Sequence, residues 1–376
     1  MTDTTAGQIG GIERQQAMMA RWLAGAGYDV SMITWDHGGD AGRSIAGVRM
    51  LALCRQEAGL PGVRFVHPKW TSLIRTMRRA DAHVYYQNCG EVATGQVAMW
   101  CRRNGRRFIY SVASDADCDA RLGHMNLRER VLYRYGLRHA DRVIVQTRRQ
   151  QRMLRDNFGT ESQLVPMPCA FPQPPVPPSS RDGRRVAWIG RLCRVKRPDR
   201  LMELARRCAD VRFDVVGPVY DERTREAAAA VPNVQLYGAV PPSGVGRFYA
   251  QASLLVCTSD YEGFPNTFLE AWSSGMPVVS TVDPDDLIRT HQLGAVAGDV
   301  PALAAAIRGL LDDPELYRRC SRNAREYYLQ HHTVDQVMPQ FAQAFDEQAR
   351  LCRGGYRKPA QMAGAPGSLR AGQDDL

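Results

Sequence analysis

The chain has 376 residues, which is enough for two domains that each bury a hydrophobic core. Its composition, with 44% hydrophobic and 23% charged residues, is ordinary for a globular protein, and no apolar run reaches the roughly 20 residues that span a bilayer. The formal net charge of +10 favours anionic partners such as nucleotide diphosphates, nucleic acid or an anionic membrane face, although a solvated arginine-rich surface gives the same charge.

Short apolar runs alternate with helical patterns over most of the chain. The predicted strands are 29–34, 63–67, 83–87, 108–112, 143–146, 186–189, 213–216, 234–237, 254–257 and 278–281. The predicted helices are 11–26, 91–103, 127–138, 198–208, 243–251 and 266–274, and the pattern is wholly helical from Pro301 to about Leu351. Such alternation is typical of an α/β fold with parallel sheets covered on both faces.

A proline-rich segment divides the chain. Residues 171–183 hold five prolines, which neither continue a helix nor lie inside a sheet, so they predict a stiff linker. We expect Rossmann-like domains over 1–170 and 184–332, and a disordered tail over 353–376. The first helix begins almost at once, so we also expect that the usual opening strand is degenerate or that the true start lies upstream.

The most informative stretch is Glu262-Gly-Phe-Pro-Asn-Thr-Phe-Leu-Glu270, which follows the strand 254–257 and opens a helix. Free N–H groups at a helix N-terminus attract phosphate. Carboxylates accept hydrogen bonds from hydroxyls. A site that offers both suits a nucleotide sugar, and the Phe-Pro-Asn insert disfavours the alternative of a solvated helix face.

A second segment, Val186-Ala-Trp-Ile-Gly-Arg-Leu-Cys-Arg-Val-Lys196, places two cations after another strand. Ligands of open α/β sheets bind beyond the carboxyl ends of the strands, which lie along one edge when the strands are parallel. We therefore expect one cleft to be lined by Arg191, Lys196, Glu262 and the helix start at Asn266. A glycine turn at Gly10-Gly11 would face it from the other domain. The alternatives are that Arg191 and Lys196 are surface charges on a loop, and that Gly10-Gly11 is an ordinary turn.

Together these segments resemble the retaining glycosyltransferases of family four. The glutamates with seven residues between them match the family's paired-glutamate motif, and the strand ending in Gly-Arg-Leu with a lysine five residues after the arginine matches a second motif. Gly10-Gly-Ile-Glu-Arg14 is similar to its N-terminal glycine turn, and the likeness covers roughly residues 8 to 350. The resemblance implies the GT-B fold, in which two Rossmann-like domains face a cleft and the C-terminal helices, here about 333–352, cross back to the first domain.

The resemblance also implies an activity, a donor domain over 184–332 and an acceptor domain over 1–170. The enzyme would move a sugar from a nucleotide-diphosphate sugar to a glycan or polyprenyl-diphosphate-linked acceptor with retention of configuration, in bacterial exopolysaccharide or other surface-polysaccharide biosynthesis. Arg191 and Lys196 would neutralise the departing diphosphate. Glu262 would contact sugar hydroxyls and Glu270 the ribose hydroxyls. The donor would also be held by Gly10, Gly11, Gly190, Gly263, Phe264, Pro265, Asn266 and Thr267. No protein nucleophile, metal or cofactor is implied.

A rival motif, Ser114-Asp-Ala-Asp-Cys-Asp119, follows the strand 108–112. Asp-x-Asp after a strand is how GT-A glycosyltransferases hold Mn²⁺ or Mg²⁺, but that interpretation leaves the second half of the chain unexplained. A calcium loop would need a glycine and a final glutamate that the stretch lacks. The family often presents a histidine in this region, where this chain has Ser114 and Asp115. We expect Asp115 or Asp117 to orient the acceptor hydroxyl, or the stretch to be a solvated loop.

Residues 69–79 predict a basic amphipathic helix. Its apolar residues Trp70, Leu73, Ile74 and Met77 recur at helical spacing, and three arginines, Arg75, Arg78 and Arg79, accompany them. Such a helix either packs on the core with a wet basic back or lies on an anionic membrane surface. The second alternative would place the N-terminal domain on the inner leaflet, where a lipid-linked acceptor is available.

Several other functions are excluded or kept open. The ten cysteines form no Cys-x-x-Cys pair or zinc spacing, and the polar N-terminus lacks the apolar segment of a signal peptide, so we expect a cytoplasmic protein, or one peripheral on the inner face of the membrane. No P-loop, nucleophile elbow or nucleic-acid module is present, so we expect no nucleic-acid partner. A non-hydrolysing nucleotide-sugar epimerase and a non-catalytic GT-B glycan-binding subunit remain as alternatives.

Overall fold

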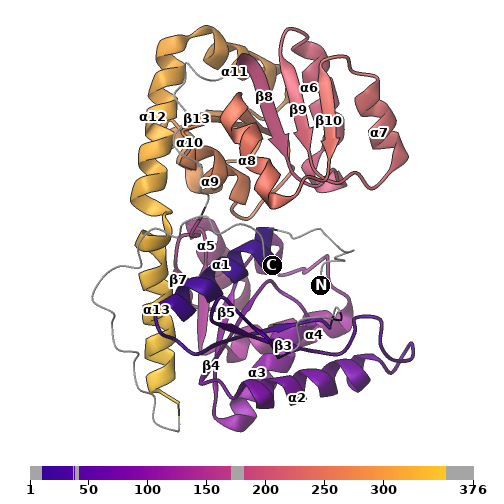
Figure 1. Cartoon of the computed structure of the whole chain (residues 1–376), viewed down its shortest axis with the longest axis vertical. Helices are drawn as coiled ribbons and strands as arrows, with labels where there is room; N and C mark the ends of the chain where they lie inside the picture. The colour runs from indigo at the N-terminus through magenta and orange to yellow at the C-terminus, as the bar shows by residue number, and fades with distance from the viewer. Residues whose placement is uncertain (1–10, 37, 39–41, 171–181, 353–376) are drawn as a thin grey trace.

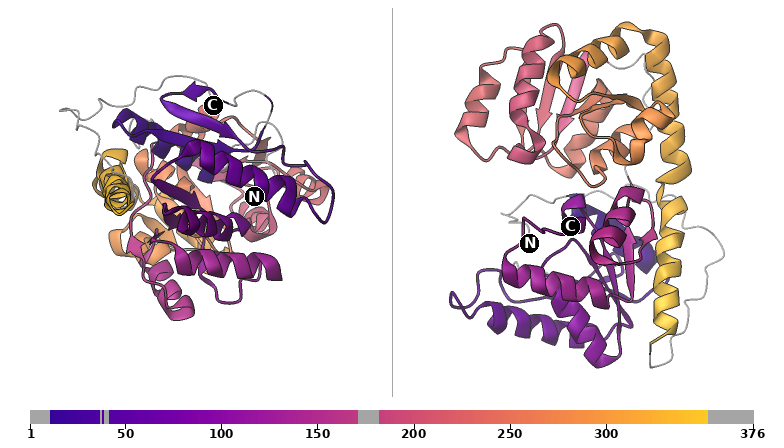
Figure 2. Two further views of the ribbon diagram at one scale, coloured as in Figure 1. Left: turned by 90° about the horizontal axis from the view of Figure 1, so that it is seen from below. Right: turned by 180° about the vertical axis from the view of Figure 1, so that it is seen from behind.

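The computed structural model describes residues 11–36, 38, 42–170 and 182–352. They form two lobes, each built on parallel strands with helices packed around them (Figure 1). Two long consecutive helices run along one side of both lobes, and the view from behind shows the same arrangement (Figure 2). The expected two-part α/β architecture is confirmed.

The N-terminal lobe contains two sheets. A parallel four-stranded sheet is formed, in spatial order, by β4 (Val84–Asn88), β5 (Arg107–Ser111), β6 (Arg142–Val145) and β7 (Gln163–Leu164). The second sheet pairs β1 (Val30–Thr34) in parallel with β3 (Val48–Ala52), which is flanked by the short antiparallel β2 (Ser44–Ile45). The central strand β5 is buried almost throughout, because helices cover both faces of the sheet.

The helices of this lobe are α1 (Gly11–Gly25), α2 (Thr71–Ala80), α3 (Val92–Asn104), α4 (Leu127–His139) and α5 (Arg148–Phe158), with short helical turns η1 (Phe65–Trp70) and η2 (Asp115–Cys118). Helices α3 and α4 cross at two glycines. A Cβ at Gly95 would lie 2.3 Å from the Leu132 carbonyl oxygen, so this crossing has room for hydrogen only.

The C-terminal lobe contains one parallel sheet in the order β10-β9-β8-β11-β12-β13. Its strands are β8 (Asp182–Ile189), β9 (Arg212–Val216), β10 (Val234–Gly238), β11 (Ala252–Cys257), β12 (Val278–Ser280) and β13 (Gly294–Val296). Its helices and helical turns are η4 (Arg194–Lys196), α6 (Pro198–Arg207), α7 (Glu222–Ala229), α8 (Pro242–Gln251), α9 (Asn266–Ser273), η5 (Pro284–Asp286), α10 (Leu287–His291) and α11 (Val300–Asp312). The chain builds the sheet outward in opposite directions from β8 and β11, so their carboxyl ends form a topological switch point, where ligands of such sheets bind.

Helices α12 (Pro314–His331) and α13 (Val334–Arg350) connect the lobes. Val337, Met338 and Phe341 of α13 are buried against the N-terminal lobe, in one hydrophobic cluster with Leu23 and Ile144. Between the two helices, the His332 carbonyl oxygen accepts a hydrogen bond of 2.9 Å from the Cys169 N–H, which ties both passages between the lobes together. The expected return of the C-terminal helices to the first domain is confirmed.

Some sequence predictions differ from the structure. The predicted strand at 63–67 is wrong, because the segment is a turn that continues into η1, and Val63 and Val66 are exposed rather than covered by a sheet. The strand at Val48–Ala52 was not predicted, and neither was α5. The opening strand, residues 171–181 of the predicted linker 171–183 and the tail at 353–376 lie outside the described residues. The last two residues of the predicted linker, Asp182 and Gly183, instead begin β8.

Candidate active site

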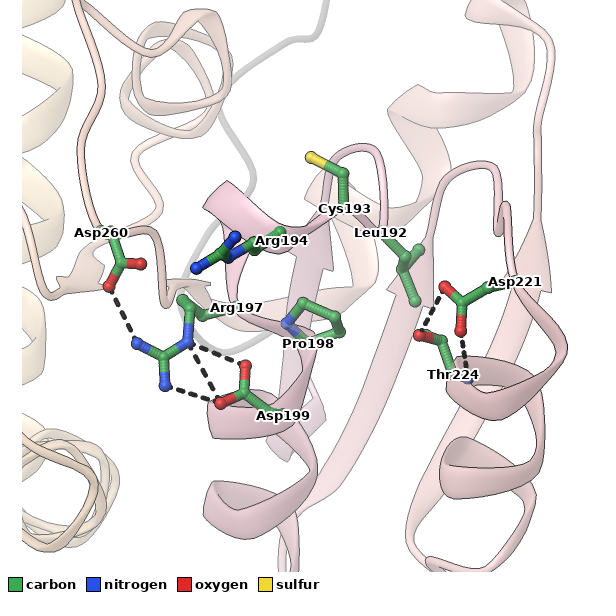
Figure 3. A pocket seen from close by; sticks show the side chains of 9 residues that line it. All are labelled: Leu192, Cys193, Arg194, Arg197, Pro198, Asp199, Asp221, Thr224 and Asp260. Carbon is green, nitrogen blue, oxygen red and sulfur yellow. Dashed lines mark hydrogen bonds and ion pairs between the residues drawn. The ribbon is translucent and has the colours of Figure 1, made fainter. Parts of the chain in front are cut away.

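A pocket of about 510 Å³ opens beside the loop that follows β8 (Figure 3). It is lined by that loop, by the first residues of α6 and α7, and by Asp260. Three of its charged residues are paired with one another, since Arg197 Nη2 lies 2.6 Å from Asp199 Oδ2 and Arg197 Nη1 lies 3.0 Å from Asp260 Oδ1. None of the predicted site residues lines this pocket, so the predicted site lies elsewhere on the same edge of the sheet.

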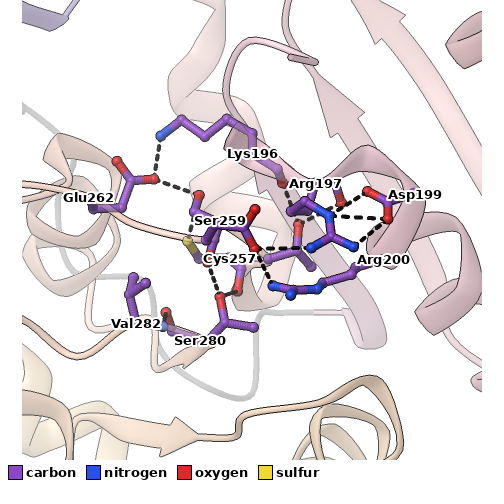
Figure 4. A network of polar contacts seen from close by, with 12 residues as sticks. Lys196, Arg197, Asp199, Arg200, Cys257, Ser259, Glu262, Ser280 and Val282 are labelled. Atoms are coloured by element: carbon purple, nitrogen blue, oxygen red, sulfur yellow. Dashed lines mark hydrogen bonds and ion pairs between the residues drawn. The ribbon is translucent and has the colours of Figure 1, made fainter. Parts of the chain in front are cut away.

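The loops after β8 and β11 are joined into one platform at the switch point (Figure 4). The Thr258 hydroxyl donates to the Lys196 carbonyl oxygen at 2.8 Å, and the Asp260 N–H donates to the Val195 carbonyl oxygen at 2.9 Å. At the end of β8, the Gly190 N–H donates a hydrogen bond of 2.9 Å to the Val216 carbonyl oxygen, which continues the sheet pairing into the loop. The strand order therefore brings together two segments that are more than 60 residues apart in the chain.

This platform carries the predicted Lys196 and Glu262 as an ion pair. Lys196 Nζ donates to Glu262 Oε1, and the Ser259 hydroxyl donates to the same oxygen at 2.6 Å. The side chains are 28% and 13% exposed, so the pair is partly desolvated but open to a ligand. Arg191 is exposed on the same loop and, among the described residues, makes no ion pair. Its guanidinium group is therefore available to an anion.

The second glutamate of the motif has a different environment. Glu270 is 5% exposed on α9, where the Tyr249 hydroxyl donates to its Oε2 at 2.6 Å. Its Oε1 lies 3.0 Å from Arg14 Nη1, which belongs to α1 of the other lobe. Burial raises the pKa of Glu270 above its ordinary value, and Arg14 and Tyr249 oppose that rise.

The start of α9 presents backbone rather than side chains. Phe264 is buried, with its ring centroid 5.3 Å from that of His332, so only its main chain can face a ligand. Pro265 is the N-cap residue, and no side chain caps the helix, which leaves the first N–H groups at Asn266 and Thr267 without such a partner. This end of α9 has the character of an anion site.

The two lobes touch at glycines. A Cβ on Gly11 would lie 2.4 Å from Asn266 Nδ2, and a Cβ on Gly263 would lie 2.6 Å from the Ala113 carbonyl oxygen of the other lobe. Glycine is therefore required at position 263, where the neighbour is main chain, whereas a side chain at position 11 would displace the Asn266 amide. Gly10 lies outside the described residues.

Asp115 borders this contact, but its neighbours already engage it. Gln150 Nε2 donates to one of its oxygens at 3.2 Å, and Arg149 Nε lies 3.2 Å from the other. Burial raises the pKa of Asp115, while Arg149 and Gln150 lower it. Asp117 is buried and accepts a hydrogen bond from the Gly90 N–H at 3.3 Å. These two carboxylates hold the loop in shape from different sides.

The aspartates of this loop do not converge on a metal. Asp119 forms an ion pair with Arg121, apart from the hydrogen bonds that Asp115 and Asp117 accept. Over the residues that the structure describes, no group of three or more His, Cys, Asp or Glu side chains could hold a metal ion. The calcium-loop interpretation therefore has no structural support.

Three residues near the site were missed by the sequence predictions. Asp285 crosses between the lobes, where its carboxylate accepts hydrogen bonds from the Arg148 N–H at 2.6 Å and the Arg149 N–H at 3.0 Å at the start of α5. Arg14 and Tyr249 hold Glu270. Arg14 ends the glycine-turn motif and could have been singled out, whereas nothing local distinguishes Tyr249 or Asp285.

Two family descriptions cover most of the chain. Residues 10–170 match "Glycosyl transferase 4-like domain" and residues 183–313 match "Glycosyl transferases group 1". The chain is 31% identical over 151 residues to the GDP-mannose-dependent alpha-mannosyltransferase of Mycolicibacterium smegmatis, covering 39% of this chain and 40% of that protein. It is 29% identical over 223 residues to an exopolysaccharide phosphotransferase of Streptomyces coelicolor, covering 55% of this chain and 23% of that protein. The matches thus span less than half the length of these relatives.

Solved structures share the fold over nearly the whole chain. Sucrose-phosphate synthase from Thermosynechococcus elongatus has a TM-score of 0.75 at 19% identity, with 90% of this chain and 93% of that chain covered. Anabaena HepE in complex with UDP and glucose has a TM-score of 0.72 at 16% identity, with 92% and 98% covered. Since the GT-A interpretation requires another fold, it is wrong. The chain belongs to the family-four glycosyltransferases, the glycosyl transferases group 1, and has the GT-B fold.

Proposed function

We propose that the protein transfers a sugar from a nucleotide-diphosphate sugar to a glycan or lipid-linked acceptor, with retention of anomeric configuration. The observation that carries this proposal is the Lys196–Glu262 pair, which lies at the switch point of the C-terminal sheet, with Glu262 in the loop that leads into the uncapped start of α9. The cation and the helix N-terminus can bind the phosphates of a ligand, and the carboxylate can accept hydrogen bonds from its hydroxyls.

In the proposed reaction, Arg191 and Lys196 stabilise the diphosphate as it leaves. Negative charge grows on the leaving oxygen in the transition state, so fixed cations and N–H groups stabilise that state more than the ground state. Glu262 is held by Lys196 and Ser259 and accepts hydrogen bonds from the donor sugar. We assign no nucleophile to the protein. The oxygen of the acceptor hydroxyl therefore bonds to the anomeric carbon on the face from which the diphosphate leaves, and the hydroxyl proton passes to the departing diphosphate oxygen.

The acceptor side of the cleft is assigned to the loop of Asp115. This loop contacts Gly263 of the donor platform, so an acceptor bound there lies next to the donor sugar. Asp115 is held by Arg149 and Gln150, which fixes the direction in which its remaining acceptor positions can orient a hydroxyl.

The names of the relatives support a proposal for the donor and the pathway. One relative is named for GDP-mannose, and one structural neighbour was solved with UDP-glucose. Another relative is named for exopolysaccharide, and a neighbour for lipopolysaccharide biosynthesis. We therefore propose a hexose donor on GDP or UDP and a role in surface-polysaccharide assembly. Neither the epimerase nor the non-catalytic alternative is favoured by these relatives.

The deciding experiment is a thermal-shift screen with UDP, GDP, ADP and their common sugars, each with and without Mn²⁺. Stabilisation by one nucleotide sugar without metal, reduced in Glu262→Gln and Lys196→Met, supports the proposal. The selected donor is then incubated with and without polyprenyl-diphosphate glycans, and the anomer of the product is read by NMR. Conversion of the donor without an acceptor indicates an epimerase, and no shift with any ligand contradicts the proposal.

We also propose that the N-terminal lobe rests on an anionic membrane where a lipid-linked acceptor is held. The apolar side of α2 packs on the core, since Met77 is 1% exposed, and the three arginines of the helix are exposed on its other side. There a shallow pocket of about 450 Å³ is lined by Thr71, Ile74, Arg75, Arg78 and Arg79. None of the helices in the described stretches is long and apolar enough to cross a bilayer.

Exposed apolar side chains accompany these arginines. Val63 and Val66 precede α2, and Leu127 on α4 is next to Arg128, whose guanidinium carbon lies 4.1 Å from the centroid of the Phe65 ring. Flotation with vesicles of phosphatidylglycerol and phosphatidylcholine at low salt tests the surface. Binding that is lost in Leu127→Glu but kept in Leu329→Glu, an exposed apolar control on α12, supports it, and no binding to anionic vesicles contradicts it.

A further inference from the structure

Arg14 and Glu270 form an ion pair between the lobes. Arg14 lies in the first turn of α1, and Glu270 lies in α9 of the other lobe, with 3.0 Å between Nη1 and Oε1. The Arg14 side chain is 33% exposed and that of Glu270 is 6% exposed. The contact of Gly11 with Asn266 places the start of α1 against the start of α9, which brings Arg14 within reach.

The pair completes the surroundings of a buried carboxylate. Within its own lobe, Glu270 receives the Tyr249 hydroxyl at 2.6 Å, but that hydroxyl brings no positive charge. A buried carboxylate without a cation is strongly disfavoured. The compensating cation comes from the N-terminal lobe, so ionised Glu270 is stabilised when the lobes are in contact.

We propose that Arg14 is a positioning residue that makes the nucleotide site complete only when the lobes close. Arg14 holds Glu270 ionised and oriented, and the carboxylate uses its remaining lone pairs for the hydroxyls of the donor ribose. This role rests on the proposed function, because it assumes that a nucleotide sugar occupies the cleft. It adds a residue from the acceptor lobe to the donor site, so donor binding and lobe closure stabilise each other.

The pair itself can be tested without any ligand. Hydrogen exchange of the peptide that covers the start of α1 is compared in wild type, Arg14→Met, Glu270→Gln and the double variant. We expect each single variant to exchange roughly tenfold faster and the double variant no faster than either, because the two changes break one interaction. Arg152→Met, at an exposed position on α5, is the matched control and should leave exchange unchanged. Additive effects, or none, would overturn the proposal.

The positioning role is tested with the donor that the screen selects. Arg14→Met should raise the donor KM roughly tenfold with a smaller change in kcat, and Arg14→Lys should restore part of it, because a cation is again present. Among the described residues, the titratable groups that interact with Glu270 are Arg14, Tyr249 and Cys169, and removal of Arg14 leaves no cation among these three. The donor KM of Arg14→Met should therefore rise as the pH falls over a range where wild type is constant.

The two outcomes remain distinguishable. Coupled exchange with an unchanged donor KM would overturn the positioning role and leave a purely structural pair. If no nucleotide sugar stabilises the protein, the proposed function fails and the positioning role fails with it, whereas the exchange data still decide whether the pair between the lobes forms.

Discussion

Replacing Gly263 by alanine should prevent the lobes from closing without weakening either lobe. The backbone at Gly263 is not in the left-handed region, so alanine is locally tolerated. Its Cβ would, however, lie 2.6 Å from the Ala113 carbonyl oxygen, 0.8 Å closer than the 3.4 Å at which ordinary contact begins, and 3.2 Å from Ser114 Cα. Both neighbours are main-chain atoms of the other lobe and cannot rotate away, so the platform and the Asp115 loop must separate by about that distance.

A displacement of this size should lower the rate of sugar transfer strongly and change the stability of the fold little. A misplacement of about 1 Å can lower a reaction rate roughly 100-fold, so kcat/KM for sugar transfer should fall by about that factor. The melting temperature should stay near that of wild type, because neither core is altered. The matched control is Gly298→Ala, where a Cβ meets no atom within 4 Å. The reasoning is refuted if Gly263→Ala transfers sugar as fast as Gly298→Ala, or if it melts far below it.

Three further substitutions test other contacts. Asp285→Ala should cost about 1 kcal/mol and speed hydrogen exchange at the start of α5, because the carboxylate that accepts two of its N–H groups is lost, whereas Asp286→Ala, at an exposed neighbour, should not. Burial lowers the pKa of His332 from 6.5 to about 4, so the folded protein binds fewer protons than the unfolded chain between these values and loses roughly 3 kcal/mol as the pH falls through them. Unfolding curves of His332→Gln should show a smaller loss, and those of His291→Gln the full loss. Tyr249→Phe should lower stability by about 1–3 kcal/mol, because a buried carboxylate loses a donor, and an unchanged melting temperature would contradict this.

Most of the fold could be predicted from the sequence, because segments with helical periodicity alternate with strand-like segments along the chain. The runs that form β5 and β11 are buried on both faces, which makes them continuous apolar segments. In β8 only the end of the strand, Val186–Ile189, is apolar, so the prediction missed its polar first residues from Asp182. The failures are short segments whose character depends on tertiary neighbours. Val48–Ala52 contains an arginine, so its pattern of hydrophobic and polar residues is mixed, but the segment pairs with β1 and three of its residues are buried. The segment 63–67, in contrast, has the composition of a strand but pairs with no described strand.

The contact between Lys196 and Glu262 was predictable because it lies within one lobe. Lys196 and Glu262 were expected together because each follows a parallel strand, and β8 and β11 are adjacent in the sheet. The contacts of Arg14 and Asp285 depend on how one lobe lies against the other, which α12 and α13 help to fix. No local pattern in the sequence records that placement, so these residues emerged only from the structure.

The two glutamates of the motif show how the same residue type acquires two roles. Glu262 precedes α9, is partly exposed and is bound by a lysine and a serine of its own lobe. Glu270 lies within the helix, where burial raises its pKa and its cation comes from the other lobe. Eight positions of chain thus separate a partly exposed carboxylate that is paired within one lobe from a buried carboxylate whose cation comes from the other lobe. Where neighbouring carboxylates are given different environments, a division of labour between them is expected. In our proposal, Glu262 accordingly binds the donor sugar, and Glu270 binds the ribose of the nucleotide while Arg14 holds it in place.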